Sequence, residues 1–394
     1  MPAKLIRFGK LLDGLGNVFH DANILVENGS IKAVDPTRNF RDAETIDLAQ
    51  FTGMPALIDV HTHMTFGPTR GGGGRTPVVN MVLGQDAAKR TLEAGVTTVR
   101  DLNSTGFLDV AMRDLINMGA MIGPRMFVVG HGLKITGAKQ GAGRAPTGGF
   151  ADGPADVMRV VRQQIAAGVD WIKIFGSTGG MDDTSGYQTF TFEEIKAAVD
   201  VAHNLGKRVA IHAYGAKAAS DAVRAGADSI EHAVDMDDDT VAEMARRKVF
   251  YVPTIDHNRY FSENWKSLGF SAKSIEQFDI VLQRNLETTK RAFRAGVPIA
   301  MGSDANFTMF GENTRELGWF IKAGMSIPDA LATATTNAAI LLGMEKSLGK
   351  IASGYLADII AVEGDPTLDM AVVMNNVKWV MKDGNVVVDK SKSN

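Results

Sequence analysis

Apolar runs alternate with helical patterns through the middle of the chain. In five segments a helical pattern ends with two residues of which the second is glycine. A short run of β-branched and apolar residues follows in each case. Four of them carry Ala-Gly (92–101, 165–175, 223–233 and 293–305) and one carries Leu-Gly (203–215). Glycine just beyond a helix adopts the left-handed conformation that ends it. The runs are short and unbroken, as expected for parallel strands buried on both faces, so the pattern predicts repeated βα units.

Eight candidate strands lie in this middle part of the chain. They are 56–62, 97–102, 125–130, 170–175, 208–213, 228–232, 249–255 and 298–303. Eight βα units over about 250 residues match the size of a closed (β/α)8 TIM barrel, which is the α/β fold that we expect. An open, doubly wound sheet is the alternative, but no GxGxxG pattern follows the first strand.

The two ends of the chain show a different pattern. Short apolar runs separated by Asp13-Gly14 and Asn28-Gly29 fill residues 1–54, and similar runs fill 353–390. Asn-Gly and Asp-Gly between apolar runs are hairpin signals. We therefore expect a small β-sandwich domain built from 1–54 plus 353–394, and a barrel domain over 55–352. Two glycine-rich stretches, 69–77 and 135–149, follow the first and third strands and are typical of long loops.

Composition excludes several classes of function. The 42 Lys and Arg residues nearly balance 45 Asp and Glu residues, so no basic surface for nucleic acid or membrane is indicated. No apolar run reaches the roughly 20 residues of a spanning helix. The N-terminus lacks the apolar core of a signal peptide, which predicts a cytoplasmic protein unless a signal was removed before the first numbered residue. The chain has no cysteine, so any metal must be held by histidine, carboxylate or a modified lysine.

Polar residues stand at the ends of five predicted strands, where core residues would be expected. They are His61, His63, Lys173, His212, His232 and Asp304. In a parallel barrel every strand ends at the same face, and that face holds the active site. We therefore expect these six side chains to converge.

The spacing of these residues is suited to metal binding. His61 and His63 are two residues apart on a strand, so both can point inward and chelate one cation. Asp304 could complete this metal site. His212 and His232 come from adjacent strands and could hold a second cation. Lys173 lies in an apolar run, where burial and neighbouring cations favour its neutral form. A neutral amine can react with carbon dioxide to give a carbamate that bridges two metals; the alternative is a lysine that points outward or forms an ion pair in the barrel.

These residues resemble the metal site of the amidohydrolase superfamily, in its binuclear form with a carboxylated lysine. The segments PALIDVHTHM (55–64) and IASGYLADIIAVEGDPTLD (351–369) are also similar to that superfamily. More narrowly, WIKIFGSTGG (171–180), IHAYG (211–215), SIEHA (229–233) and MGSDA (301–305) resemble the branch of Xaa-Pro dipeptidases and Lys/Arg carboxypeptidases, which includes ochratoxin-hydrolysing amidases. One stretch of the sequence departs from the pattern of this branch, at a position linked to substrate contact. Members of the branch commonly carry Thr-Gly-Gly-His after the third strand, whereas residues 135–140 of this chain contain no histidine.

The resemblance implies a hydrolase with two divalent metal ions, most often zinc, and with Lys173 as N6-carboxylysine. Hydroxide activated by the two metals would attack a carbonyl, while Asp304 acts first as general base and then as general acid. Loop residues at the same face are candidates for substrate contact: Tyr214, His131, His257 and Ser177. For the two histidines, a loop residue without function is the alternative.

Three functions stay open from the sequence. The first is hydrolysis of an amide bond next to a C-terminal amino acid, as in a dipeptide or an N-acyl amino acid. The second is hydrolysis of a cyclic amide, carbamate or organophosphate ester on the same metal centre. The third is an inactive barrel that serves as a binding module. An anionic small-molecule substrate is favoured by cations on the active-face loops, which are Arg70, Arg75, Lys134, Lys139, Arg144 and Arg259. Related enzymes often form homo-oligomers, which the resemblance implies here as well.

Overall fold

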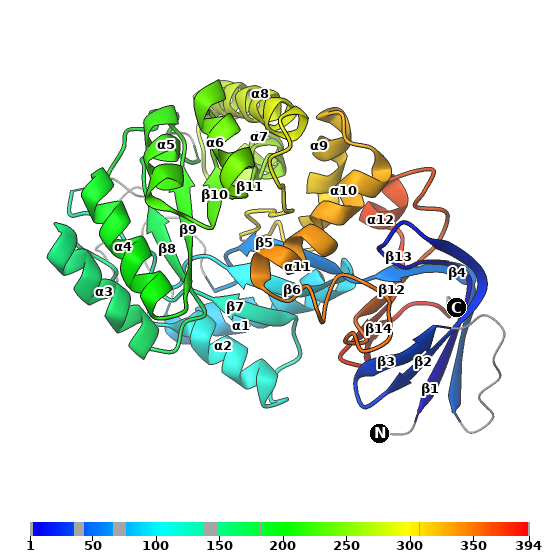
Figure 1. The fold of residues 1–394 in the computed structure, drawn as a ribbon. Coiled ribbons are helices and arrows are strands. Elements are labelled where there is room, and N and C mark those ends of the chain that lie inside the picture. The colour runs from blue at the N-terminus through cyan, green and yellow to red at the C-terminus, as the bar shows by residue number, and fades with distance from the viewer. Residues whose placement is uncertain are drawn as a thin grey trace.

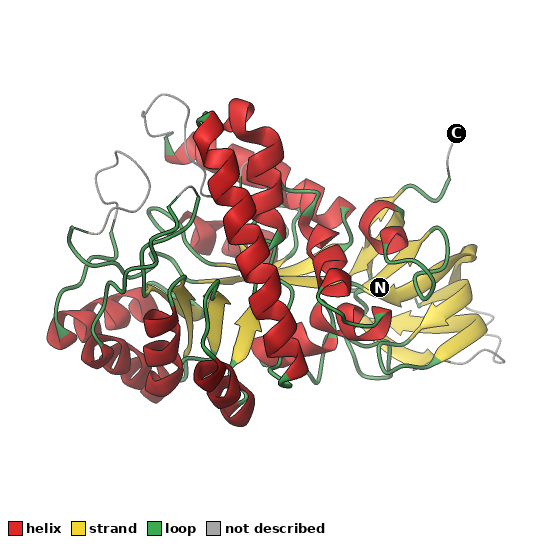
Figure 2. Ribbon diagram, turned by 90° about the horizontal axis from the view of Figure 1, so that it is seen from above, coloured by secondary structure: helices red, strands yellow, loops and turns green. Residues whose placement is uncertain are grey.

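The computed structural model describes residues 3–34, 43–65, 76–137, 148–181, 183–306 and 308–392. Helices and strands alternate through the middle of the chain, and a sheet made from both ends of the chain lies to one side (Figure 1). Figure 2 shows the same division from above, with helices gathered around the middle strands. No helix among these described residues is long and apolar enough to cross a membrane.

Parallel strands form the centre of the α/β part. One sheet consists of β5 (Leu57–Thr62), β6 (Val96–Asp101) and β7 (Arg125–Val128). The other consists of β8 (Trp171–Phe175), β9 (Arg208–Ala213), β10 (Ser229–His232) and β11 (Phe250–Val252). The first seven predicted strands are thereby confirmed to within a few residues.

The eighth predicted strand, 298–303, is wrong as a regular strand. Isolated parallel bridges join Tyr251 to Ile299 and Thr62 to Ala305, so this segment does lie between β11 and β5. However, the amide of Met301 donates to the Thr333 carbonyl (2.9 Å) rather than to a strand, and this interrupts the ladder. On the opposite side, a bridge from Leu133 to Ile174 connects the segment after β7 to β8.

The helices follow the strands and cover their outer face. Those of the first four βα units are α1 (Pro77–Glu93), α2 (Leu108–Asn117), α3 (Pro154–Ala166) and α4 (Phe192–Asn204). They are followed by α5 (Ala216–Ala225), α6 (Asp238–Arg247), α7 (Asp256–Leu268) and α8 (Ala272–Arg294). After the eighth segment come the 3-10 turn η1 (Asn313–Arg315), α9 (Glu316–Lys322), α10 (Ile327–Thr333) and α11 (Thr336–Leu342). Glycine ends several of these helices as expected; Gly226, after α5, has φ +100°.

Side-chain alternation along β8 separates two hydrophobic cores. Ile172 and Ile174 pack in the same cluster as Ile195 and Val199 of helix α4. Trp171 belongs instead to a cluster with Val60 and Val252 from other strands. Successive residues of a strand point to opposite faces, so Lys173 shares the inner face with Trp171.

The terminal sheet has seven strands in the order β14-β13-β12-β4-β1-β2-β3. Its N-terminal strands are β1 (Lys4–Leu12), β2 (Val18–Glu27), β3 (Ser30–Val34) and β4 (Glu44–Pro55). Its C-terminal strands are β12 (Ile359–Val362), β13 (Val377–Lys382) and β14 (Asn385–Asp389), with helix α12 (Ala371–Asn375) before β13. A bridge from Ser30 to Leu356 brings β3 back to the segment before β12, and Phe8, Ile24 and Trp379 share one core. The predicted two-layer sandwich is therefore one continuous sheet that folds around a common core.

Candidate active site

The polar residues at the strand ends converge as expected. Nε2 of His63 lies 3.1 Å from Oδ1 of Asp304, and Nε2 of His61 lies 3.6 Å from the same oxygen. His61, His232 and Asp304 each offer a ligand atom, and these atoms lie within 4.8 Å of one another. The ring of His212 follows at 4.6 Å from that of His232, centroid to centroid. Segments that are up to about 240 residues apart in sequence thus form one cluster of imidazoles around a carboxylate.

The protonation states of this cluster suit a metal ion. Burial is the largest cause that lowers the pKa of His61, His232 and His212, in the last case to about 3. Neutral imidazole is the form that binds metals. Nε2 of His61 and Nε2 of His212 are buried, and neither makes a hydrogen bond within the part of the chain that the structure describes. Two buried nitrogens without such a bond fit a cation as their missing partner.

Asp304 stays ionised at the centre of the cluster. Burial by itself raises the pKa of this carboxyl, but the charge that the rings of His61, His257 and His63 carry when protonated and the hydrogen bond to His63 outweigh it and lower the pKa below its ordinary value. A permanent negative charge surrounded by imidazoles is a good ligand for a hard or borderline cation.

Lys173 is buried on the inner face of β8, with 1% of its surface exposed. Burial is the main cause that lowers the pKa of its ammonium to about 8, although Glu231 and Asp304 oppose this shift. Its Nζ lies 5.4 Å from the centroid of the Phe175 ring. The structure therefore places a buried lysine, whose ammonium has a lowered pKa, beside the histidine cluster.

The backbone is strained at this rim. His232, Thr254 and Asp304 have φ values of +68°, +56° and +53°. Residues other than glycine in this region carry about 1–3 kcal/mol of strain each, and such residues gather at functional sites. Thr254 joins this group through its side chain as well, since its Oγ1 lies 2.7 Å from Nδ1 of His232.

Sequence reasoning missed the residues that orient the histidines. Glu231 accepts a hydrogen bond from Nδ1 of His61 (2.8 Å) and pairs with Nη2 of Arg100 (2.8 Å). Asp59 accepts hydrogen bonds from the backbone of His61 (3.1 Å) and of Ser303 (3.0 Å), which ties β5 to the segment that carries Asp304. A signal was present, because Asp59, Arg100 and Glu231 are charged residues inside predicted buried strands, where a charge needs a partner.

Two of the predicted substrate contacts lie beside the cluster. The ring of Tyr214 stacks on His212 at 5.1 Å, and Nδ1 of His257 lies 3.8 Å from Oδ2 of Asp304. Ser177 is buried, and its hydroxyl donates to the Thr178 carbonyl (2.7 Å) and accepts from the amide of Tyr214 (2.8 Å). Both of these hydrogen bonds fix the loop that positions Tyr214.

His131 is not brought to the cluster. Its ring packs edge-on against Phe107 at 4.5 Å and lines a cavity with Gln164 of helix α3. Gly130, with φ +65°, bends the chain just before it. The bend explains why a residue expected at the strand end faces the helices instead.

The active-face cations separate into three groups. Arg259 is neutralised by Asp256 (2.8 Å), Glu312 (2.9 Å) and Glu263. Lys134 has no such ion pair among the described residues. The remaining candidate cations lie outside the described residues; they are Arg70, Arg75, Lys139 and Arg144. Residues 138–140, which belong to the stretch that lacks the Thr-Gly-Gly-His histidine, also lie outside them.

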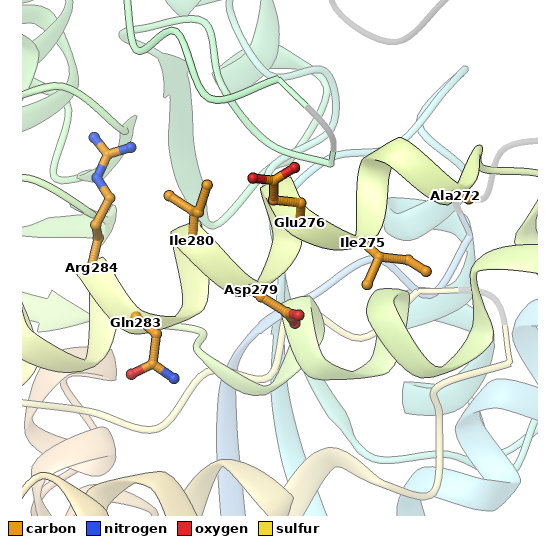
Figure 3. A pocket seen from close by; sticks show the side chains of 7 residues that line it. All are labelled: Ala272, Ile275, Glu276, Asp279, Ile280, Gln283 and Arg284. Atoms are coloured by element: carbon orange, nitrogen blue, oxygen red, sulfur yellow. The ribbon is translucent and has the colours of Figure 1, made fainter.

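A hollow on the outer surface is separate from this site. Ala272, Ile275, Ile280 and Arg284 line it, and all its lining residues belong to helix α8 (Figure 3). It contains none of the clustered residues, and a single helix cannot surround a small ligand. The strand-end cluster is therefore the candidate functional site.

The fold and this cluster resemble those of amidohydrolases, and comparison with known proteins agrees. The model of the Amidohydrolase family matches residues 52–387, so the chain belongs to that family. The chain is 27% identical to ochratoxinase from Aspergillus niger, over 93% of this chain and 82% of that protein. A crystal structure of a Xaa-Pro dipeptidase with methionine bound in its active site has a TM-score of 0.90, with 32% identity over 98% of this chain and 100% of that one.

A second solved structure, of a prolidase in complex with N-methylphosphonate-L-proline, has a TM-score of 0.90 and 26% identity, again over 98% and 100% of the two chains. The chain is thus a hydrolase that belongs, within its superfamily, to the branch of Xaa-Pro dipeptidases and ochratoxinase. The resemblance seen in the sequence is confirmed.

Proposed function

We propose that the protein hydrolyses an amide bond next to a C-terminal amino acid, as in dipeptides, N-acyl amino acids and ochratoxin-like amides. The observation that supports this most directly is the cluster of four imidazoles, one carboxylate and a buried lysine at one rim. The names of the relatives point the same way, since one is a Xaa-Pro dipeptidase and another an ochratoxinase. A cyclic amide, carbamate or organophosphate ester is the alternative substrate class.

We divide the side chains into two sets of candidate ligands. We assign His61, His63 and Asp304 to one divalent cation and His212 with His232 to a second, with Lys173 as a carbamate that serves both. Zinc suits imidazole and carboxylate ligands, so we expect zinc. Two such cations, when bound, would polarise a carbonyl and lower the pKa of water.

The chain itself supplies proton transfer and orientation. Asp304 faces the candidate ligands through Oδ1 and His257 through Oδ2, so its carboxylate can accept a proton from the attacking water. The same group then returns the proton to the leaving nitrogen. Tyr214, held by Ser177 and stacked on His212, lies where a hydroxyl can orient the carbonyl or the acyl group.

A hydrolysis screen tests the proposed reaction. Protein purified without chelator would be incubated with dipeptides, N-acyl amino acids, lactams and phosphotriesters, and products would be read by mass spectrometry. Cleavage of the first two groups is expected, and cleavage restricted to lactams or phosphotriesters would replace the proposal by its alternative. Elemental analysis should find close to two metal equivalents per chain; less than half an equivalent after metal is added back contradicts the binuclear assignment.

The remaining architectural proposals concern the whole chain. We propose that the bridges on both sides of the two parallel sheets close a (β/α)8 barrel over 55–352, and that 1–54 plus 353–394 form a separate β domain. We also propose a homo-oligomer, because related enzymes are commonly assembled in this way. Light scattering on the purified protein measures its mass, and the mass of a monomer would contradict the last proposal.

A further inference from the structure

Lys134 lies on the inner face of the parallel strands, near Phe175 of β8. The amide of Leu133 donates to the Lys173 carbonyl (2.8 Å), and the amide of Phe175 donates to the Leu133 carbonyl (3.0 Å). Leu133 and Ile174, which form this bridge, both pack in the outer core. Because side chains alternate along paired strands, Lys134 shares the opposite face with Lys173 and Phe175.

Glycine at position 132 makes room for this arrangement. A Cβ atom there would lie 2.5 Å from the ring of Phe175 and 3.3 Å from Cγ of Lys173. The ring of Phe175 therefore occupies the place of a side chain at 132. Nζ of Lys134 lies 5.7 Å from the centroid of this ring and 6.0 Å from that of Phe150.

The ring of Phe175 is a common neighbour of the Lys134 ammonium and of the candidate metal site. The centroid of Phe175 lies 5.6 Å from that of His212 and 5.4 Å from Nζ of Lys173. In an N-acyl amino acid only two atoms, the amide nitrogen and the α-carbon, separate the scissile carbonyl from the carboxylate. A carbonyl held at the cluster would thus bring the carboxylate toward Lys134.

The charge of Lys134 lacks an anionic partner within the described residues. Its ammonium makes no hydrogen bond or ion pair there, and burial lowers its pKa. Among the undescribed segments, 66–75 and 138–147 contain no aspartate or glutamate, whereas residue 182, beyond β8, is an aspartate. Arg259, the other described candidate, already contacts Asp256 and Glu312. A half-buried cation without an anion is unfavourable unless a ligand supplies one.

We propose that Lys134 is the receptor for the free carboxylate of the leaving amino acid. This role rests on the proposed hydrolysis of amides of C-terminal amino acids and names the group that selects them. A lysine ammonium binds a carboxylate through a short, charge-assisted hydrogen bond. The rings of Phe150 and Phe175 flank the ammonium and limit the water that competes for it.

Paired substrates test this role. Each N-acyl amino acid would be compared with its C-terminal amide, which has the same scissile bond but no charge. Lys134→Met removes the charge and keeps the length of the side chain, whereas Lys134→Arg keeps the charge. Loss of one charge-assisted hydrogen bond is expected to raise KM for the acid about tenfold to a hundredfold, with a much smaller change for the amide. Lys134→Arg should restore part of the preference for the acid.

Lys322→Met is the matched control. Its ammonium also lies over an aromatic ring, that of Trp319 at 3.7 Å, but on helix α9, away from the cluster. This variant should leave both substrates unaffected. Circular dichroism and metal content are compared across all variants, so that misfolding is recognised.

The outcomes separate the two proposals. If the wild type cleaves acids and Lys134→Met keeps the same KM and the same preference, the role of Lys134 is refuted while the proposed function stands. If the wild type cleaves neither substrate, the proposed function fails. The role of Lys134 is then tested by measuring the binding of N-acyl amino acids by calorimetry. Equal binding to wild type and Lys134→Met, or no binding to either, overturns the proposed role of Lys134 as the carboxylate receptor.

Discussion

Replacement of Glu231 by glutamine is expected to weaken metal binding without a direct contact to the metal. Glu231 is fully buried and holds Nδ1 of His61 with one oxygen and Arg100 with the other. The carboxylate requires a proton on Nδ1, which leaves Nε2 of His61 free as a ligand. Glutamine keeps the shape but loses the charge, and its amide group can donate to Nδ1 and so favour the wrong tautomer.

The magnitude follows from two separate losses. Partners that orient a metal-binding histidine contribute about 10- to 100-fold in metal affinity, which corresponds to about 1.4–2.8 kcal/mol. In addition, Arg100 remains buried without its anion, and breaking such a pair destabilises a protein by about 3–5 kcal/mol. We expect a loss of stability at the lower end of this range, because Arg100 keeps a hydrogen bond to the Val60 carbonyl (2.6 Å) and stacks on Trp171 at 4.4 Å.

Competition with a coloured chelator measures metal affinity, and thermal unfolding of the metal-free protein measures stability. The matched control is Asp358→Asn, which removes a buried carboxylate from Arg125 (2.8 Å) at the junction with the terminal sheet. Both variants should lose stability, but only Glu231→Gln should lose metal affinity. If Glu231→Gln binds metal as tightly as the wild type while both variants lose similar stability, then Glu231 does not orient His61 and the reasoning is refuted.

The other predictions concern Asp304 and Lys173. Asp304→Asn should retain the fold and lose most activity, about 100-fold or more for a group that moves a proton; a metal-loaded variant with near wild-type turnover would rule out this role. Lys173→Ala should lose both metal and activity, and acetate or propionate should partly restore them by filling the space of the carbamate oxygens; absence of rescue favours an unmodified lysine. For Lys173, the folded-state pKa of about 8 lies below the ordinary value of 10.5, so the unfolded chain binds more protons between these pH values and the stability of the metal-free protein should rise with pH across this window. Because only the neutral amine reacts with carbon dioxide, activation of metal-free protein at constant dissolved carbon dioxide should speed up about tenfold per pH unit from pH 6 to 8 and then level off. Activation that is immediate and independent of both pH and carbon dioxide would contradict the carbamate.

Local patterns in the sequence were sufficient for much of the fold and for the candidate ligands. Glycine after each helical pattern and a buried apolar run after each glycine predict the βα units, because both signals depend only on neighbouring residues. His61 and His63 share a face through the two-residue period of a strand. Lys173 stands out for the same reason, since its neighbours on either side are apolar. The rule that parallel strands end at one face then predicts their convergence with His212, His232 and Asp304.

Tertiary structure decided which groups satisfy, orient or neutralise these residues. Glu231 lies 170 positions from His61, and Arg259 meets Glu312 across 53 positions, so no local pattern connects either pair. The turn at Gly130 directs His131 toward the helices, and the hydrogen bond from Met301 to Thr333 interrupts the eighth strand. The physical reason is that strand periodicity is a property of the local backbone, whereas a hydrogen bond or ion pair depends on which distant segments pack together. Lys134 shows both levels, because only the pairing of its segment with β8 places it on the same face as Lys173.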